Sequence, residues 1–327
     1  MKDQKTDAEE PTLALRSRKY LRWLGRIVAG LLVLAVAGTI YENLSEARDA
    51  RAYPPPGLMV ALGGYRMHIN CKGSGAPTVV IGSGWGDSSA AWGRVQRQVA
   101  KTTRACTYDR AGMGWSEPSP APRTAREFAK ELHTLLTNAN EPGPYVLVGH
   151  SLGGHAVRVY AHDYPAEVSG LVLIDSQDLP APDAAALVPA PRPGRASLPV
   201  LMARIGLVRL LAGPLGAIQN LPDEDKDAYA ALAVTPRSVQ TFLDEAMGMS
   251  EGGAQARAVT SLGALPLIVL SRGKEQDAKH TAAQAELLQL SNDSQQFFAD
   301  HSGHSIHIEQ PEAAVAAIEK MVELLRK

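Results

Sequence analysis

Ser151 lies at the centre of residues 149–153, Gly-His-Ser-Leu-Gly, the pattern in this chain best suited to chemistry. The β-forming run 145–148 precedes it, and a helix-like segment, 154–161, follows it. A strand, a sharp turn and a helix form the context of a nucleophile elbow, where flanking glycines keep a strained turn free of clashes. Ser151 is therefore the predicted nucleophile, and the helix N-terminus behind it favours the negative charge that develops during acyl transfer.

A serine hydroxyl is a weak nucleophile at neutral pH, so it needs a nearby base and a group that orients that base. His304 lies between the last strand candidate and the closing helix, where the chain order serine, acid, histidine places the base. His301 and His307 have a spacing that also suggests a metal site, but no second ligand cluster supports it, so we expect no metal. His150 and His155 flank the serine too closely to act as its base and are expected to pack around it.

Two carboxylates compete to orient the histidine. Asp175 directly follows the apolar strand candidate 171–174. Glu275 lies shortly after the next strand candidate, 265–271, with Asp277 close behind. Both strand ends can face the same histidine at one edge of a sheet, and the residues alone leave the choice open. Taken singly, each acid is also well explained as a solvated loop carboxylate.

An oxyanion hole needs two backbone N–H groups. Leu152, directly after the serine, supplies one. Loop 82–86, Gly-Ser-Gly-Trp-Gly, is expected to supply the other through Trp85, with Gly84 as the second choice. The loop also invites comparison with phosphate-cradling loops, but it has neither Gly-Lys-Ser nor Gly-x-Gly-x-x-Gly, so we expect no nucleotide cofactor.

Strand and helix candidates alternate along the chain from residue 57, which is typical of a mostly parallel sheet with helices on both faces. The strand candidates are 58–62, 65–71, 78–81, 104–108, 145–148, 171–174, 265–271 and 295–299; the helix candidates are 89–99, 124–137, 281–290 and 311–325. Residues 177–262 break this alternation and are too long for a simple connection, so we predict an inserted helical cap. Its apolar run, 198–211, is expected to pack in the core of the cap rather than on a membrane surface.

The N-terminal region divides into a basic tail, 1–26, an uncharged run, 27–41, and a linker, 42–56, that ends in a proline-rich stop. Counted from Trp23, with Arg26 reaching back to the surface, the apolar stretch approaches the ~20 residues needed to span a bilayer. Positive charge before it predicts a single-pass anchor with a cytoplasmic N-terminus and an exported domain. A cleaved signal sequence, with Ala-Val-Ala at 35–37, is the main alternative and leads to a secreted or periplasmic protein.

Composition limits the function classes further. The chain has 327 residues, 45% hydrophobic and 20% charged, which suits one large globular domain with an N-terminal appendage. Its formal net charge of −1 gives no electrostatic footprint for nucleic acid. Cys71 and Cys106 form neither a disulfide framework nor a zinc pattern, so each is expected to pack as a small apolar residue. A disulfide between them stays open, because export would permit it.

These motifs resemble the α/β-hydrolase family over about residues 57–327. The resemblance rests on residues 149–154, on Asp-Arg-Ala-Gly-Met-Gly-Trp-Ser at 109–116, and on Gly-His at 303–304 followed by Glu-Gln-Pro-Glu at 309–312. It implies an eight-stranded sheet, a Ser-His-acid triad and no cofactor. The chain is most similar to membrane-anchored bacterial members with Tyr-Glu-Asn and Pro-Pro-Pro-Gly segments before the domain.

The chain departs from the family pattern twice. Ser83 replaces a usual histidine, and residues 271–275 lack the usual Gly-x-x-Asp, so that Glu275 would have to replace the aspartate. Close relatives end the sixth strand as Asp175 does here, which favours Asp175. The resemblance implies a serine hydrolase for a small-molecule ester or related acyl substrate; amide cleavage, as in related aminopeptidases, and a non-catalytic membrane-tethered binding protein are the alternatives. Ser151 argues against dehalogenase and epoxide hydrolase chemistry, which resemble this scheme but use an aspartate nucleophile.

Overall fold

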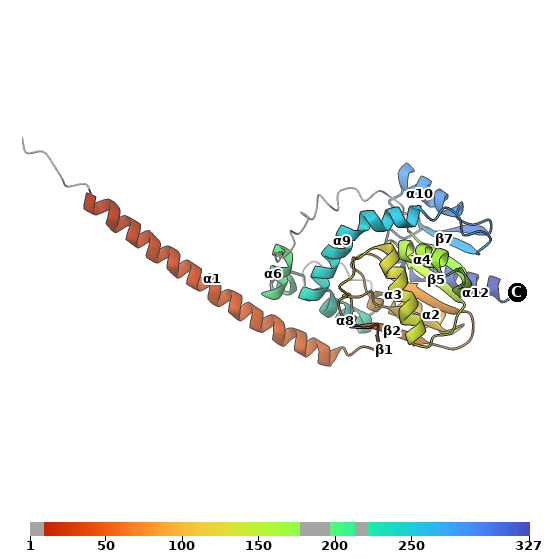
Figure 1. The fold of residues 1–327 in the computed structure, drawn as a ribbon, viewed down its shortest axis with the longest axis horizontal. Coiled ribbons are helices and arrows are strands. Elements are labelled where there is room, and N and C mark those ends of the chain that lie inside the picture. The colour runs from red at the N-terminus through yellow and green to blue at the C-terminus, as the bar shows by residue number, and fades with distance from the viewer. Residues whose placement is uncertain (1–9, 177–196, 213–220) are drawn as a thin grey trace, which may run out of the picture.

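The computed structural model describes residues 10–176, 197–212 and 221–327. Its sheet has eight strands in the order β1-β2-β4-β3-β5-β6-β7-β8 (Figure 1). Only the pairs β1–β2 and β2–β4 are antiparallel. The strands are β1 (Leu58–Ala61), β2 (Arg66–Lys72), β3 (Thr78–Gly82), β4 (Ala105–Tyr108), β5 (Tyr145–His150), β6 (Val168–Ile174), β7 (Leu267–Arg272) and β8 (Ser294–Ala299). The predicted eight-stranded, mostly parallel sheet is confirmed.

Helices cover both faces of the sheet because the central strands are apolar on both sides. One face packs against η1 (Ser89–Trp92), α2 (Gly93–Val99), α11 (Ile306–Glu309) and α12 (Pro311–Leu325). The other packs against α3 (Ala125–Asn138), α4 (Leu152–Asp163) and α10 (Ala278–Leu288), with η2 (Pro165–Glu167) at the start of β6. Within β5, Val146 and Val148 enter the first core and Tyr145 and Leu147 the second. Neither surface of this strand is left to water.

Four described helices lie between β6 and β7, where the sequence predicts a cap. They are α6 (Leu198–Arg204), α7 (Leu207–Ala212), α8 (Asp223–Ala233) and α9 (Pro236–Arg257), while 177–196 and 213–220 lie outside the described residues. The long α9 packs against α3, α4 and α6. In the run 198–211, Val200 and Ala203 are buried as expected. For its leucines the core expectation is wrong, since four are exposed: Leu198, Leu201, Leu210 and Leu211.

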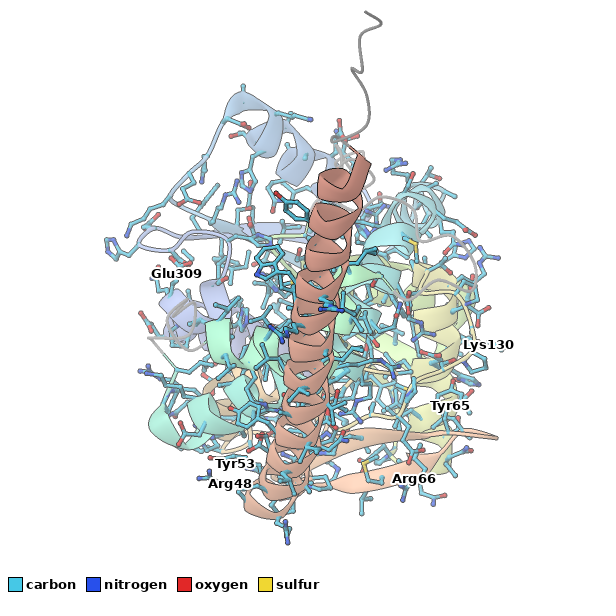
Figure 2. The ribbon with its side chains drawn as sticks, turned by 90° about the vertical axis from the view of Figure 1, so that its left-hand side faces the viewer. Arg48, Tyr53, Tyr65, Arg66, Lys130 and Glu309 are labelled. Carbon is cyan, nitrogen blue, oxygen red and sulfur yellow. A yellow bond between two sulfur atoms is a disulfide. The ribbon has the colours of Figure 1, made fainter. Side chains whose placement is uncertain are left out.

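The N-terminal region forms one continuous helix, α1 (Glu10–Ala52), before the chain turns at Tyr53. Only the C-terminal part of α1 lies beside the body, and the rest of the helix projects away from it (Figure 1); with that side toward the viewer, α1 lies in front of the body (Figure 2). Its part Tyr20–Ala52 is long and apolar enough to cross a membrane: an 18-residue window has a mean hydropathy of 1.9, and none of that window is buried. These properties suit a membrane anchor or a signal sequence.

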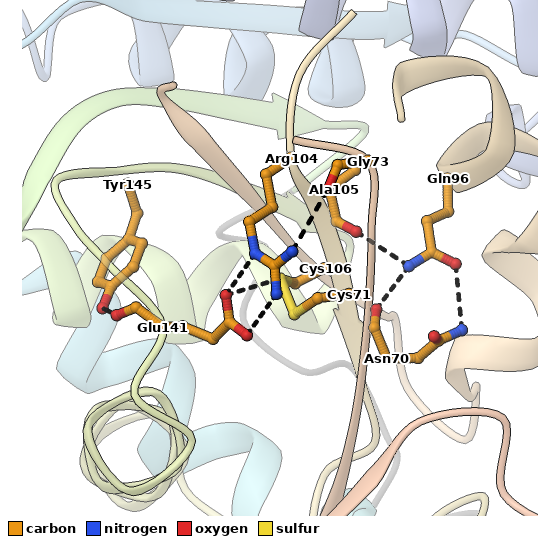
Figure 3. Close-up of a disulfide and its surroundings, with 9 residues drawn as sticks. All are labelled: Asn70, Cys71, Gly73, Gln96, Arg104, Ala105, Cys106, Glu141 and Tyr145. Carbon is orange, nitrogen blue, oxygen red and sulfur yellow. Dashed lines mark hydrogen bonds and ion pairs between the residues drawn. A yellow bond between two sulfur atoms is a disulfide. The ribbon is translucent and has the colours of Figure 1, made fainter. Parts of the chain in front are cut away.

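Cys71 and Cys106 form a disulfide, so the expectation that each packs by itself is wrong (Figure 3). The register of β2 against β4 places the two residues directly opposite each other, with Cα atoms 4.0 Å apart. The ion pair between Arg104 and Glu141 lies beside the bond, at 2.6 Å. Sequence spacing does not reveal this pairing because β3 lies between the two strands along the chain.

Replacing both cysteines, Cys71→Ala with Cys106→Ala, should lower the free energy of unfolding by roughly 3 to 4 kcal/mol, because the bond closes a loop across a separation of 35 residues. Urea unfolding of the oxidised chain, the reduced chain and the double variant measures this, and the last two should agree. Thiol titration of the unreduced, denatured chain should find no free thiol, and two free thiols would contradict the disulfide.

Candidate active site

Ser151 occupies a strained turn between β5 and α4. Its φ of 50° and ψ of −120° lie in a region that non-glycine residues rarely adopt. A Cβ on Gly149 would lie 2.6 Å from the Cα of Gly154, and one on Gly153 would lie 2.6 Å from the carbonyl oxygen of Gly82. The turn therefore needs glycine at both flanking positions. Ser151 is partly exposed and its backbone N–H donates to the Ile174 carbonyl at 3.1 Å.

The sheet brings the predicted residues to one edge, because parallel strands end on the same side. His150 and Ile174 are paired across β5 and β6, so Ser151 and Asp175 follow paired residues directly. On the other side of β5, Gly82 pairs with Gly149, which places the loop after β3 beside the serine.

Asp175 is completely buried and accepts hydrogen bonds from two histidines. The Nδ1–H of His304 donates to Oδ2 at 2.6 Å, and the Nε2–H of His280 donates to Oδ1 at 2.8 Å. The backbone N–H of Arg272 adds a weaker bond at 3.3 Å. Burial favours the neutral acid, but the bonds from His304 and His280 outweigh it and lower the pKa of Asp175. The carboxylate is therefore ionised at neutral pH and can hold the imidazole of His304.

Glu275, the alternative acid, has different surroundings. Its side chain is exposed, and within the described residues its carboxylate accepts no hydrogen bond. Its backbone carbonyl instead accepts from Arg272 at 3.0 Å. Asp277, the acid that lies close behind Glu275 in the sequence, caps α10: its side chain accepts a hydrogen bond from the backbone N–H of His280 at 2.7 Å. The structure thus brings Asp175, and neither Glu275 nor Asp277, to His304.

The histidine loop is tied to the serine turn. The Nε2–H of His150 donates to the backbone carbonyl of His304 at 2.9 Å. Burial, with help from nearby His307 and His304, lowers the pKa of His150 well below its usual value, so its ring is neutral. Since Nδ1 of His304 is bonded to Asp175, its Nε2 is the atom free for proton transfer. The side chain of His304 is 42% exposed, which leaves this atom open to a ligand.

The neighbouring histidines do not join His304 in a ligand cluster. His301 is exposed, and the ring of buried His307 stacks on Trp92 with centroids 4.3 Å apart. Among the described residues, one group that could share a cation combines His307 with Asp87 and His150. A second includes the two cysteine sulfurs, which are already bonded to each other.

The loop after β3 lies over the serine turn. A Cβ on Gly84 would be 3.3 Å from the Cβ of Ser151. The ring of Trp85 stacks on Phe242 of α9, with centroids 4.2 Å apart, and its Nε1–H donates to the Phe242 carbonyl at 2.9 Å. In the part of the chain that the structure describes, the backbone N–H groups of Trp85 and Leu152 have no acceptor. Both are available to an oxyanion.

A buried ion pair holds this loop, and sequence reasoning missed it. Arg110 bonds Glu245 at 2.6 Å and donates to the carbonyls of Ser83 and Gly84 at 2.5 and 2.6 Å. Glu245 also accepts from the Gly86 N–H at 3.1 Å. The Ser83 hydroxyl has no partner among the described residues, so Arg110 fixes the loop through its backbone. The motif 109–116 pointed to Arg110, but its partner Glu245 is 135 residues away along the chain and could not be predicted.

His280 is the second residue that the sequence analysis missed. It lies in the first turn of α10 and is nearly buried. The Asp277 cap fixes its backbone while its ring reaches Asp175. An Asp-x-x-His pattern at a helix start was the available signal, and only the fold shows that this helix begins beside the end of β6.

Comparison with known proteins agrees with the fold of this chain. The model of the alpha/beta hydrolase family matches residues 79–318. The uncharacterized protein YqjL of Bacillus subtilis (strain 168) is 28% identical over 253 residues, or 76% of this chain and 84% of that protein. A thermophilic esterase from Thermogutta terrifontis superposes with a TM-score of 0.61 at 21% identity, covering 82% of this chain and 97% of its own. Epoxide hydrolase CorEH gives 0.61 at 20% identity, covering 82% and 98%. The family model covers well over half of the chain, and the chain therefore belongs to the α/β-hydrolase family.

Proposed function

We propose that this protein is a serine hydrolase that cleaves a carboxylic ester or a related acyl bond. The observation that carries the proposal is the bond between Asp175 and His304, at the sheet edge where Ser151 sits on its strained turn. An esterase and an epoxide hydrolase match the fold equally well, so the fold does not select the reaction. The serine at the elbow favours acyl transfer.

In the proposed mechanism, Ser151 Oγ attacks the acyl carbon while His304 Nε2 takes its proton. Asp175 orients the imidazole and stabilises its protonated form. The N–H groups of Trp85 and Leu152 stabilise the oxyanion, and His304 then returns the proton to the leaving group. Water, activated by the same histidine, releases the acyl group from Ser151.

We also infer that α1 anchors the enzyme in a membrane, with its N-terminus in the cytoplasm. The cationic residues before the apolar run support this orientation. The Ala-Val-Ala segment at 35–37 lies inside a continuous helix, where the hydroxyl of Thr39 donates to the Ala35 carbonyl at 2.9 Å. Such a helical site is less suited to signal cleavage than an extended one.

The nucleophile is tested by labelling the full chain, in detergent, with a fluorophosphonate probe. Wild type should label at one site per chain; Ser151→Ala should not label, and His304→Ala should label about 10³-fold more slowly. His301→Ala, a change at an exposed neighbour, is the matched control and should label normally. An unlabelled, folded wild type would contradict the proposal, as would labelling that survives Ser151→Ala.

The acid is tested by comparing Asp175→Asn with Glu275→Gln. The first should lower kcat on a soluble acetate ester by about 10³- to 10⁴-fold, because an amide cannot hold the histidine in the required tautomer. The second should change kcat less than about 2-fold, because no hydrogen bond of its carboxylate is lost. The reverse ranking would assign the role to Glu275.

His280 is expected to act as a positioning residue for Asp175. In His280→Leu the bond at Oδ1 is lost, so kcat should fall about 10- to 100-fold with KM nearly unchanged. His280→Gln can still donate and should recover most of that loss. If both variants retain the wild-type kcat, or both lose it equally, His280 does not act through its bond to Asp175.

A further inference from the structure

The apolar face of the cap, defined by Leu198, Leu201, Leu210 and Leu211 on α6 and α7, has no function in the mechanism above. We propose that this face rests on the bilayer that α1 crosses, and that the substrate is a membrane-resident amphiphile with an acyl ester. This inference rests on the proposed hydrolase function and on α1 as an anchor. It adds the surface from which the substrate is drawn.

The first argument is the close contact between α1 and the cap. A Cβ on Gly38 would overlap the carbonyl of Ile205, so only glycine permits the helix to approach this closely. Across the same contact, a Cβ on Gly206 would lie 2.7 Å from the ring of Tyr41. Figure 1 shows α6 beside α1, at the edge of the body next to the helix.

An ion-pair network reinforces this contact. Arg209 of α7 bonds Glu42 at 2.9 Å and Asp49 at 2.6 Å, both on α1. Glu42 is 1% exposed, so the cap covers the first acid that follows the apolar run. A buried carboxylate left without its partner is strongly unfavourable, which ties α7 to this position on α1.

The second argument is depth. From Trp23 to Tyr41 an α-helix rises about 27 Å, close to the ~30 Å hydrocarbon thickness of a bilayer. If Trp23 marks one border, Tyr41 marks the other. Because Gly206 contacts Tyr41, the turn between α6 and α7 lies at the membrane border. The apolar face of the cap then meets the bilayer without any movement of the body.

The third argument is the chemistry of the face. Leu198 is 68% exposed and Leu210 is 61% exposed. Residues 198–212 contain no acidic residue, and of their two arginines Arg209 is paired with α1 while Arg204 is exposed. Exposed leucines with a nearby cation suit a helix that lies in the interface of a membrane with anionic lipids. The direct continuity with α1 favours lipid over a second protein as the partner.

The same element is connected to the reaction site. α6 packs on α9, and α9 carries Phe242 and Glu245, which hold the loop of Trp85 and Gly86. A cavity of about 700 Å³ lies among α6, α9 and residues 118–124. Its lining combines apolar side chains such as Val200 and Met247 with charged ones of both signs, among them Arg204, Arg237, Asp244 and Glu251, and Ser151 and His304 are not part of it. Such a lining suits a molecule with both an acyl chain and a polar group.

Contact with lipid is tested on the full chain in vesicles that contain anionic lipid. Because both native cysteines are bonded, Leu201→Cys and Leu210→Cys each give one site for an environment-sensitive fluorophore. Lipids with a nitroxide near the headgroup should quench both probes at least 3-fold more than a probe at Phe298→Cys, an exposed position on β8. Equal quenching at the three positions would overturn the membrane contact.

The substrate class is tested with a long-chain acyl ester in the same vesicles and a soluble acetate ester. The double change Leu201→Glu with Leu210→Glu should lower hydrolysis of the vesicle ester about 10-fold and leave the acetate rate within 2-fold; Phe298→Glu should affect neither. The acetate rate also reports that the variant is folded. If the double variant and wild type hydrolyse the vesicle ester at equal rates, the inference is overturned and the proposed function is not. If wild type is inactive on both esters and is not labelled by fluorophosphonate, the proposed function itself is overturned. Should the double change lower the acetate rate equally, the cap acts on the site and not through the membrane, which also overturns the inference.

Discussion

The left-handed backbone of Ser151 is the constraint on which the site depends. Such a conformation costs on the order of 1 to 3 kcal/mol for a residue with a side chain, so the surroundings must enforce it. β5 does so because it is hydrogen-bonded between β3 and β6 and buried on both faces. The helix α4 closes against it through glycine contacts that admit no Cβ. The burial of the central sheet is thus what holds the serine, and the parallel strand order brings Asp175 to the same edge.

Three buried charges, the carboxylate of Asp175 and the pair of Arg110 with Glu245, position the rest of the site. Asp175 gathers two histidines from separate segments, so it fixes the loop of His304 and the start of α10 together. Arg110 and Glu245 join the loop after β3 to the cap helix α9. Removing one partner of such a pair leaves an uncompensated buried charge, which costs about 3 to 5 kcal/mol. The loop that carries the proposed oxyanion donor Trp85 therefore depends on the position of the cap as well as on the sheet.

The sequence predicted those features that depend on neighbouring residues along the chain, such as strands and helix ends. Long apolar runs predicted the central strands, and the proline at 311 marked the start of the closing helix, which ends at Leu325 as expected. Contacts between residues far apart in the sequence could not be predicted. Arg110 and Glu245 are 135 residues apart, and the pairing of Cys71 with Cys106 depends on a register between strands that are not consecutive. The choice between Asp175 and Glu275 was open for the same reason: two acids at strand ends look alike until one is seen to be buried.

The leucines of α6 and α7 show a further limit of sequence reasoning, because an apolar run has the same composition whether it faces a core or a bilayer. What distinguishes the two is the position of α1, the proposed anchor. α1 brings Tyr41 against Gly206, so the cap is held at one depth by a contact that only glycine permits and by the pairs of Arg209. A cap fixed in this way has no need to bury its leucines within the protein. In the proposed arrangement, the helix that anchors the protein in the bilayer therefore also decides which face of the protein meets that bilayer.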